Sequence, residues 1–252
     1  MMRKALILFG ILMMFLGCDS ENAWDCFQES GEIIQEEFHV DGFKKIIIWN
    51  RVKLYISEGP VQQVVIETGS NLLNEIRVRV EDSILKVSDR NSCNYVREYG
   101  LTKVYVTSPN IEEIRNSSGL AVESIGTISF NELELISIDP DRLGEFHNVG
   151  DFIMDDLDVN VLRVNANGLS RFYLSGKAFN AHFGVADGDV RIESGELEVQ
   201  NMFISHRSTN KMIVYPIVSI RGQIRGLGDV VAKNHPPIVE VEELFTGRLI
   251  FE

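Results

Sequence analysis

The sequence predicts an all-β fold built as a β-solenoid, in which short strands stack coil upon coil. A short strand, a polar turn with Gly or Asn, and another short strand recur about six times between Asn116 and Lys233. The residues that anchor these turns, spaced 25, 24, 20, 22 and 18 residues apart, are Gly119, Gly144, Gly168, Gly188, Asn210 and Gly228. Outside the N-terminal leader, no stretch has the pattern of a helix-length amphipathic segment, so parallel α/β folds with nucleotide sites are not expected. A period of this length indicates stacked units rather than one enzyme core.

The turn residues have a common physical basis. Each corner of a coil needs a residue that accepts a positive φ angle, which Gly adopts without penalty and Asn tolerates better than most residues. Asn210 stands where the other coils have Gly and fits this rule. The alternative is a sandwich or meander, in which Gly-Asp and Asn-Gly pairs form ordinary hairpin turns.

The composition is that of a globular and strongly acidic protein. The 252 residues are 44% hydrophobic and carry 24 Lys and Arg against 37 Asp and Glu, a net charge of -13. Removal of a leader containing Arg3 and Lys4 would leave -15. Phosphate binding depends on concentrated positive charge, and no local basic run interrupts the acidic sequence. Nucleic acid is therefore not expected as a partner.

The N-terminus has the pattern of an export signal. Met1 to Lys4 is a short positive region, an apolar run of thirteen residues from Ala5 to Gly17 follows, and Cys18 comes directly after it. Thirteen residues are too few to span a bilayer. The stretch from Phe15 to Cys18 resembles a bacterial lipobox, which implies a lipid on Cys18 and a membrane tether. We expect a signal peptide over 1–17, a lipidated tether over 18–30 and one elongated domain over 31–252; the alternative is a soluble exported protein with a free Cys18.

Two further cysteines remain, Cys26 and Cys93. In an exported protein, two cysteines that remain after lipidation are expected to form a disulfide. It would close 68 residues, and a loop of that size contributes about 4 kcal/mol in the chain-entropy account. A metal site is the alternative, but such a site needs three or four ligands and the sequence has no CxxC or HxxxH spacing.

The region from Ile33 to Thr107 also predicts short strands. Residues 43–49, 52–56 and 64–67 are rich in β-branched and aromatic residues and are bounded by Gly, Asn or Pro. Residues 76–80 and 84–87 alternate with period two across a turn, which predicts a hairpin with one buried face. Only residues 71–75 look helical, for barely more than a turn.

Several of these residues together resemble the head GIN domain family of exported Bacteroidetes proteins, known as putative auto-transporter adhesins. The resemblance covers approximately residues 26 to 240 and is carried by Cys26-Phe27, Ser30-Gly31, Phe43, Ile46, Asn71-Leu72-Leu73, Ile76, the stretch from Cys93 to Arg97, and Gly226-Leu227-Gly228-Asp229-Val230. It implies a right-handed β-helix-like fold, an exported or surface location and no established catalytic activity. The chain departs from the family pattern near its end, where Ala232 and Asn234 precede Pro236 in place of an aromatic residue and Gly.

Candidate chemistry is sparse. His182 and His206 lie 24 residues apart, about one coil, so they could stack and share a metal. Acidic residues with arginines nearby could bind calcium or perform acid and base chemistry in a β-helical lyase or hydrolase. The residues concerned are Asp139, Asp141, Asp151, Asp155, Asp156 and Asp158, with Arg142, Arg163 and Arg171. They lack the spacing of a calcium loop, so we assign no catalytic residue, metal or cofactor.

Three other sequence patterns were considered as functional motifs. No Gly-x-Ser-x-Gly nucleophile elbow is present, and the Gly-rich stretch from Gly222 to Gly228 is flanked by strands, which predicts a β-corner rather than a phosphate cradle. Asp82-Ser83-Ile84 matches a short Bacteroidetes O-glycosylation pattern in an expected exposed turn, so Ser83 is a candidate glycosylation site. Recurring aromatics either pack in the core or form an exposed ladder for sugar rings; they are Phe172, Tyr173, Phe179, Phe183 and Phe203.

These observations favour a non-enzymatic lipoprotein of the cell envelope, held at the outer membrane by its lipid and either exposed at the surface or facing the periplasm. Its solenoid face would bind a glycan or a protein. A β-helical polysaccharide-active enzyme and a purely structural envelope module are the alternatives. The last segment, from Ile238 to Phe251, alternates apolar and acidic residues and is expected to cap the open end or to mediate a homo-oligomer.

Overall fold

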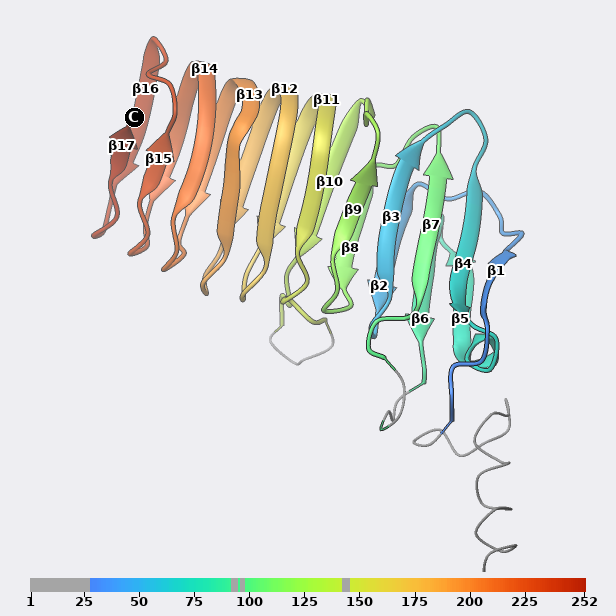
Figure 1. Cartoon of the computed structure of the whole chain (residues 1–252). Coiled ribbons are helices and arrows are strands. Elements are labelled where there is room, and N and C mark those ends of the chain that lie inside the picture. Colours follow the sequence, from blue (N-terminus) through green and yellow to red (C-terminus); the bar gives the residue numbers. More distant parts are fainter. Residues whose placement is uncertain (1–27, 92–94, 96–97, 142–145) are drawn as a thin grey trace, which may run out of the picture.

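The computed structural model describes residues 28–91, 95, 98–141 and 146–252, and within them the chain is an all-β solenoid of stacked coils (Figure 1). No α-helix occurs in these ranges; the short helical stretch expected near residue 73 is a single 3-10 turn, Leu73–Glu75. The strands are β1 (Ile33–Glu37), β2 (Lys45–Trp49), β3 (Lys53–Glu58), β4 (Gln63–Gly69), β5 (Ile76–Glu81), β6 (Ile84–Asp89), β7 (Lys103–Ser108), β8 (Glu113–Ser117), β9 (Val122–Ile125), β10 (Glu132–Ser137), β11 (Phe152–Ala166), β12 (Arg171–Val185), β13 (Arg191–His206), β14 (Met212–Ile224), β15 (Val230–Ala232), β16 (Ile238–Glu243) and β17 (Leu249–Phe251).

Each coil contributes to two sheets that enclose the core. Sheet 1 contains β7, β3, β9, the first halves of β11 to β14, β15 and β17, all parallel. Sheet 2 contains β6, β2, β8, β10, the second halves of β11 to β14, and β16. We call the edge where the chain passes from sheet 2 to sheet 1 the turn edge, and the opposite edge, where the long strands bend, the bend edge. The turn edge lies along the lower side of Figure 1 and the bend edge along its upper side.

The coil length follows from the register of sheet 1. Phe152, Phe172, Ile192, Met212, Val230 and Leu249 are paired in succession. The steps between them are 20, 20, 20, 18 and 19 residues. The predicted repeat is therefore confirmed from Phe152 onward. Inward side chains from successive coils stack between the sheets, as in the buried pair Phe152 and Phe172.

The N-terminal coils are not stacked in chain order. β2 pairs with both β6 and β8, and β3 pairs with both β7 and β9, so the coil formed first along the chain lies between the two that follow it. Antiparallel strands close this end, because β1 and β4 extend sheet 1 and β5 extends sheet 2. The predicted β5–β6 hairpin is confirmed, with Asp82 and Ser83 at φ angles of 52° and 61° in its turn.

The turn chemistry is confirmed in part. Gly119, Gly168 and Gly188 have φ angles of 81°, 91° and 83°. The expectation was wrong for Asn210, whose φ is not positive; instead its Oδ1 accepts a hydrogen bond from the Lys211 N–H at 2.9 Å. Gly228 also lacks a positive φ and is explained by close packing, since a Cβ there would lie 1.8 Å from the Asn210 carbonyl oxygen. Gly144 lies outside the described residues.

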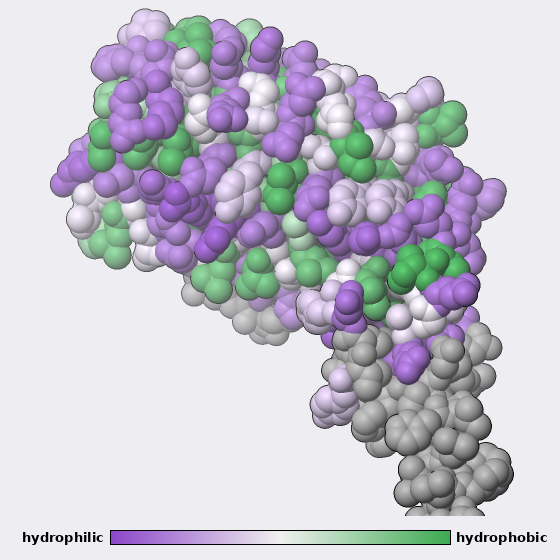
Figure 2. All heavy atoms as spheres, viewed as in Figure 1, coloured by the Kyte–Doolittle hydropathy of each residue, from purple (hydrophilic) through white to green (hydrophobic). Residues whose placement is uncertain are grey.

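The C-terminal segment forms the last coil rather than a separate cap. β16 pairs with β14 and β17 pairs with β15, both in parallel, and each has a neighbour on one side only. Seen from the same side as Figure 1, the surface is mostly hydrophilic, with apolar residues scattered across it and along its lower margin (Figure 2). Within the described ranges, no helix is long and apolar enough to cross a membrane.

Candidate functional site

The five recurring aromatics divide between core and surface. Phe172 and Phe183 are buried, as the packing interpretation predicts. The side chains of Tyr173, Phe179 and Phe203 are 38%, 56% and 47% exposed. They lie on sheet 1, at the bend edge and on sheet 2 respectively, so they do not form one continuous ladder. Phe179, which has the largest exposed fraction of these five aromatics, borders a groove.

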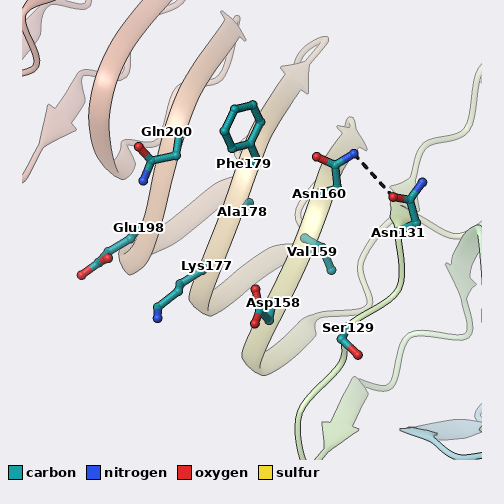
Figure 3. Close-up of a pocket in the computed structure, with 10 residues that line it drawn as sticks. All are labelled: Ser129, Asn131, Asp158, Val159, Asn160, Lys177, Ala178, Phe179, Glu198 and Gln200. Carbon is teal, nitrogen blue, oxygen red and sulfur yellow. Dashed lines mark hydrogen bonds between the residues drawn. The ribbon is translucent and has the colours of Figure 1, made fainter.

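This groove crosses three successive coils at the bend edge and has a volume of about 490 Å³ (Figure 3). It is bounded on one side by the loop between β9 and β10. The lining residues are Ser129 and Asn131 from that loop, Asp158, Val159 and Asn160 from β11, Lys177, Ala178 and Phe179 from β12, and Glu198 and Gln200 from β13.

Strand periodicity places the polar groups in two parallel rows. Asp158, Lys177 and Glu198 are paired across β11, β12 and β13 and form a row of alternating charge. Two residues further along each strand, Asn160, Phe179 and Gln200 form a second row. The residues between the rows point inward, as the buried Val159 and Ala178 show. Successive side chains in a row are therefore about one strand spacing, 4.8 Å, apart.

The second row offers an aromatic face between two amides. The Asn160 Nδ2 donates to the Asn131 Oδ1 at 3.5 Å, which extends the row to a fourth coil (Figure 3). The amides of Asn160 and Gln200 flank the Phe179 ring on the neighbouring strands. Amides both donate and accept hydrogen bonds, and an exposed aromatic ring offers an apolar face. This arrangement suits a ligand with apolar ring faces and hydroxyl groups at its rim.

The first row keeps its charges apart. Among the described residues, no ion pair of 4.0 Å or less involves Lys177, although acidic residues precede and follow it in the row. Their polar atoms line the groove and are available to a ligand. A second depression, of about 520 Å³, lies on sheet 1 and also has an exposed aromatic residue; it is lined by Tyr173, Ile213, Gly195 and Lys233 among others.

The aspartates singled out in the sequence do not converge on one site. Asp155 lines the sheet 1 depression, Asp158 lines the bend-edge groove, and the Asp156 carboxylate accepts a hydrogen bond from the Thr127 hydroxyl. Asp151 accepts the Arg171 N–H at 2.8 Å beside the turn edge. Asp139 is buried and Asp141 is exposed in the loop after β10.

The arginines near them are equally dispersed. Arg163 forms an ion pair with Glu132 at 2.8 Å on sheet 2, whereas Arg142 lies outside the described residues. In the part of the chain that the structure describes, no three His, Cys, Asp or Glu residues form a group suited to a metal.

His182 and His206, which the sequence left as a possible stacked pair, do not stack. His182 points outward and is paired with Phe203, whose ring centroid is 5.9 Å from its own. His206 is paired with Val185 and points inward, with only 1% of its surface exposed. Burial lowers the pKa of His206, although its hydrogen bond with the Asn210 carbonyl oxygen at 3.0 Å opposes the shift. Burial and the neighbouring Arg163 lower the pKa of His182 as well.

Of the remaining predicted sites, one lies within the described residues and three lie outside them. Ser83 is exposed in the hairpin turn, where a glycan has room, and it stays a candidate for glycosylation. Cys18, Cys26 and Cys93 lie outside the described residues, so their lipidation and pairing stay predictions.

Apart from Asp158, the sequence interpretation missed the polar residues of the groove. Asp158, Lys177 and Glu198 are separated by 19 and 21 residues, which is the coil length. Asn160, Phe179 and Gln200 repeat with the same steps. A search for polar residues recurring at the coil period would have aligned both rows.

The chain is similar to one described protein family and to several solved structures. A family described as "Putative auto-transporter adhesin, head GIN domain" matches residues 42–236. No curated protein matches the chain. A crystal structure described as a putative adhesin from Bacteroides fragilis NCTC 9343 is similar with a TM-score of 0.77 and 21% identity, over 89% of this chain and 99% of that chain.

Two Parabacteroides proteins are similar over 87% of this chain and 97% of theirs. One, described as a putative adhesin from Parabacteroides merdae ATCC 43184, has a TM-score of 0.58 and 16% identity. The other, described as a putative lipid binding protein from Parabacteroides distasonis ATCC 8503, has a TM-score of 0.60 and 14% identity. These likenesses show the fold, and because the family match spans most of the chain, the protein belongs to the head GIN domain family.

Proposed function

We propose that the protein is a non-enzymatic adhesin of the cell envelope that binds a glycan in the bend-edge groove. The observation that carries this proposal is the second row of the groove, where Phe179 lies between Asn160 and Gln200. A sugar ring would pack one face on the exposed phenyl ring. Its hydroxyl groups would exchange hydrogen bonds with the amides on either side.

The first row would select among sugars. Lys177 would bind a carboxylate or sulfate substituent, while Asp158 and Glu198 would accept hydrogen bonds from hydroxyl or amino groups. Because both rows cross the coils with a repeat of about 4.8 Å, they suit an extended chain rather than a single compact ligand. The ligand class is therefore an oligosaccharide that spans two or three coils.

The position of the groove supports a role outside the cell. The protein is proposed to be anchored in the outer membrane through a lipid on Cys18. The described chain begins at Gln28, whose amide donates to the Asn71 carbonyl oxygen at 2.9 Å. Asn71 lies next to the 3-10 turn at the turn edge, so the groove is at the edge opposite to the tether. A ligand in the groove would meet the protein on its outward side.

A glycan-binding assay tests the groove. We expect the purified chain to bind a subset of immobilised bacterial or host polysaccharides. Phe179→Ala should weaken binding by roughly five- to hundredfold, because loss of a stacked ring removes about 1–3 kcal/mol. Phe203→Ala is the matched control, since this phenylalanine is also exposed but lies outside the groove. Equal loss with both variants, or no loss with Phe179→Ala, would contradict the assignment.

The same ligands distinguish a binder from a glycan-active enzyme. A binder leaves the chain length of its bound polysaccharide unchanged after prolonged incubation. Release of shortened products that is abolished by the combined substitution Asp155→Asn, Asp156→Asn and Asp158→Asn, with the fold retained, would support an enzyme instead.

Added protease tests the location. Digestion of the protein on intact cells, with a periplasmic control protein preserved, is the expected result for a surface adhesin. Protection would place it in the periplasm and would contradict adhesion.

A further inference from the structure

The turns at the C-terminal half of the turn edge concentrate basic residues on an otherwise acidic protein. We define the turn strip as the five segments 167–171, 186–191, 207–211, 225–229 and 244–248. It contains six basic residues, Arg171, Arg191, Arg207, Lys211, Arg225 and Arg248, and three acidic ones, Asp187, Asp189 and Asp229. The strip therefore has a net charge of +3, whereas the whole chain has -13. Arg191 and Arg248 form ion pairs with Glu193 and Glu243 just outside the strip, so its exposed positive charge comes mainly from the other basic residues. No local run of basic residues predicts this strip, because each coil adds only one or two.

Two of these arginines lie side by side. Arg207 follows His206 and Arg225 follows Ile224, and His206 and Ile224 are paired neighbours in sheet 2. Both arginines are exposed, and neither forms an ion pair with a described residue within 4.0 Å. Two like charges about one strand spacing apart repel each other. An anionic partner would relieve this repulsion.

The acidic residues of the strip are engaged within it. The Asp189 carboxylate accepts hydrogen bonds from the Thr209 hydroxyl at 2.6 Å and from the Asn210 amide at 3.2 Å. The Asp229 carboxylate accepts the Arg248 N–H at 2.8 Å. These carboxylates hold neighbouring turns together, and the basic groups Arg207, Lys211 and Arg225 remain exposed beside them.

Large apolar side chains protrude from the same turns. Leu169 is 60% exposed, Leu227 is 55% exposed and Phe245 is 58% exposed. They come from three different coils, and apolar residues are visible among hydrophilic ones along this margin of the molecule (Figure 2). A polyanion in solution would gain little from such side chains, whereas the interface of a bilayer accepts both apolar tips and basic groups.

The strip lies at the same edge of the molecule as the start of the described chain. The Asn91 Nδ2 donates to the Leu72 carbonyl oxygen at 3.1 Å, and an Arg51 guanidinium nitrogen donates to the Asn91 carbonyl oxygen at 2.6 Å. Together with the bond from Gln28 to Asn71, these contacts place the start of the described chain at the turn edge. Cys18 and Gln28 are ten positions apart, so the chain between them spans at most about 35 Å.

From this arrangement we infer that the turn strip docks on an anionic lipid surface and holds the solenoid with its bend edge facing away from the membrane. The inference rests on the lipid anchor in the proposed function, but the strip is a second contact that acts without the lipid. Leu169, Leu227 and Phe245 would enter the headgroup region, and Arg207, Lys211 and Arg225 would bind lipid phosphates.

Vesicle cosedimentation of a chain without its lipid tests the strip directly. All strands of the described residues lie within Ile33–Phe251, so a chain that begins at Asp19 contains every one of them. We expect it to bind vesicles of phosphatidylethanolamine and phosphatidylglycerol, to bind phosphatidylcholine vesicles far less, and to lose binding in 0.5 M salt. The variant Arg207→Glu/Arg225→Glu should bind at least tenfold more weakly. Leu169→Ser/Leu227→Ser should also bind more weakly.

The matched control is Lys177→Glu/Lys233→Glu, which changes the net charge equally but outside the turn strip, in the bend-edge groove and in the sheet 1 depression. It should bind vesicles like the wild type. The inference would be overturned if the wild type bound neutral vesicles equally well, or if the arginine variant bound anionic vesicles fully. It would also be overturned if the arginine variant lost binding to a soluble sulfated dextran but kept its binding to vesicles. The arginine variant should still bind the glycan of the groove, so failure of the strip and failure of the groove give different results.

Discussion

The rings of Phe152 and Phe172 stack in the core with their centroids 4.8 Å apart and their planes within 7° of each other. The two residues are paired on adjacent coils of sheet 1, and both are fully buried. The ring spacing thus matches the rise from one coil to the next. The stack links packing to register, because a slip of one residue would exchange Phe172 with the exposed Tyr173.

We expect Phe172→Ala to destabilise the protein by about 3–5 kcal/mol, since it leaves a cavity between two coils. Tyr173→Ala, one residue further along the same strand, should change the free energy of unfolding by about 0.5 kcal/mol. Urea denaturation measures both. Similar losses for the two variants would mean that the register of β12 is not the one described.

Substitutions at two glycines distinguish the free-energy cost of backbone strain from the cost of close packing. Gly188 and Gly126 have positive φ angles of 83° and 72°. A Cβ at Gly188 would lie 2.3 Å from the Gly168 carbonyl oxygen, whereas a Cβ at Gly126 meets no atom within 4 Å. Gly126→Ala should cost about 1–2 kcal/mol from strain alone. Gly188→Ala should cost clearly more in the same thermal or urea unfolding measurement, because neighbouring turns must also move apart; equal costs would contradict close stacking of the turns.

The repeat was predictable from the sequence because strand propensity and turn residues are local properties. The exact spacing of the repeat was less predictable. Val122 and Phe152 are paired although they lie 30 positions apart, because the segment between β10 and β11 is longer than those between the later strands. The position of the β2 and β3 coil between two later coils was also not predictable, since it depends on pairing between distant segments.

The functional surfaces depend on the same long-range register. Phe179 belongs to a site only because Asn160 and Gln200 flank it on neighbouring strands. Arg207 and Arg225 lie together for the same reason. The sequence suggested an acidic surface without a basic patch, and this expectation was wrong at the turn strip because single basic residues on successive coils are brought together by stacking.

The predicted disulfide between Cys26 and Cys93 has a direct test. Mass spectrometry of the exported protein under non-reducing conditions should detect the linked peptides. Cys93→Ser should lower the free energy of unfolding by about 4 kcal/mol, because it releases a 68-residue loop. The reduced wild type should be destabilised by the same amount, and free thiols in the exported protein would exclude the bond.

The buried His206 predicts a loss of stability in mild acid. Burial lowers the pKa of this histidine below its ordinary value of 6.5. Its Nε2 lies 3.0 Å from the Asn210 carbonyl oxygen, and its Nδ1 has no hydrogen-bond partner among the described residues. Below pH 6.5 the unfolded chain therefore binds a proton that the folded chain does not, so the free energy of unfolding falls as the pH falls, by at most about 1.4 kcal/mol per pH unit for this group.

Urea unfolding between pH 7.5 and pH 5 measures this dependence. His206→Gln removes the titration while an amide can still donate to the Asn210 carbonyl oxygen, so its stability should fall less steeply with decreasing pH than that of the wild type. Parallel curves for His206→Gln and the wild type would show that this histidine is protonated equally in the folded and unfolded chains, which burial beneath the Asn210 turn does not allow.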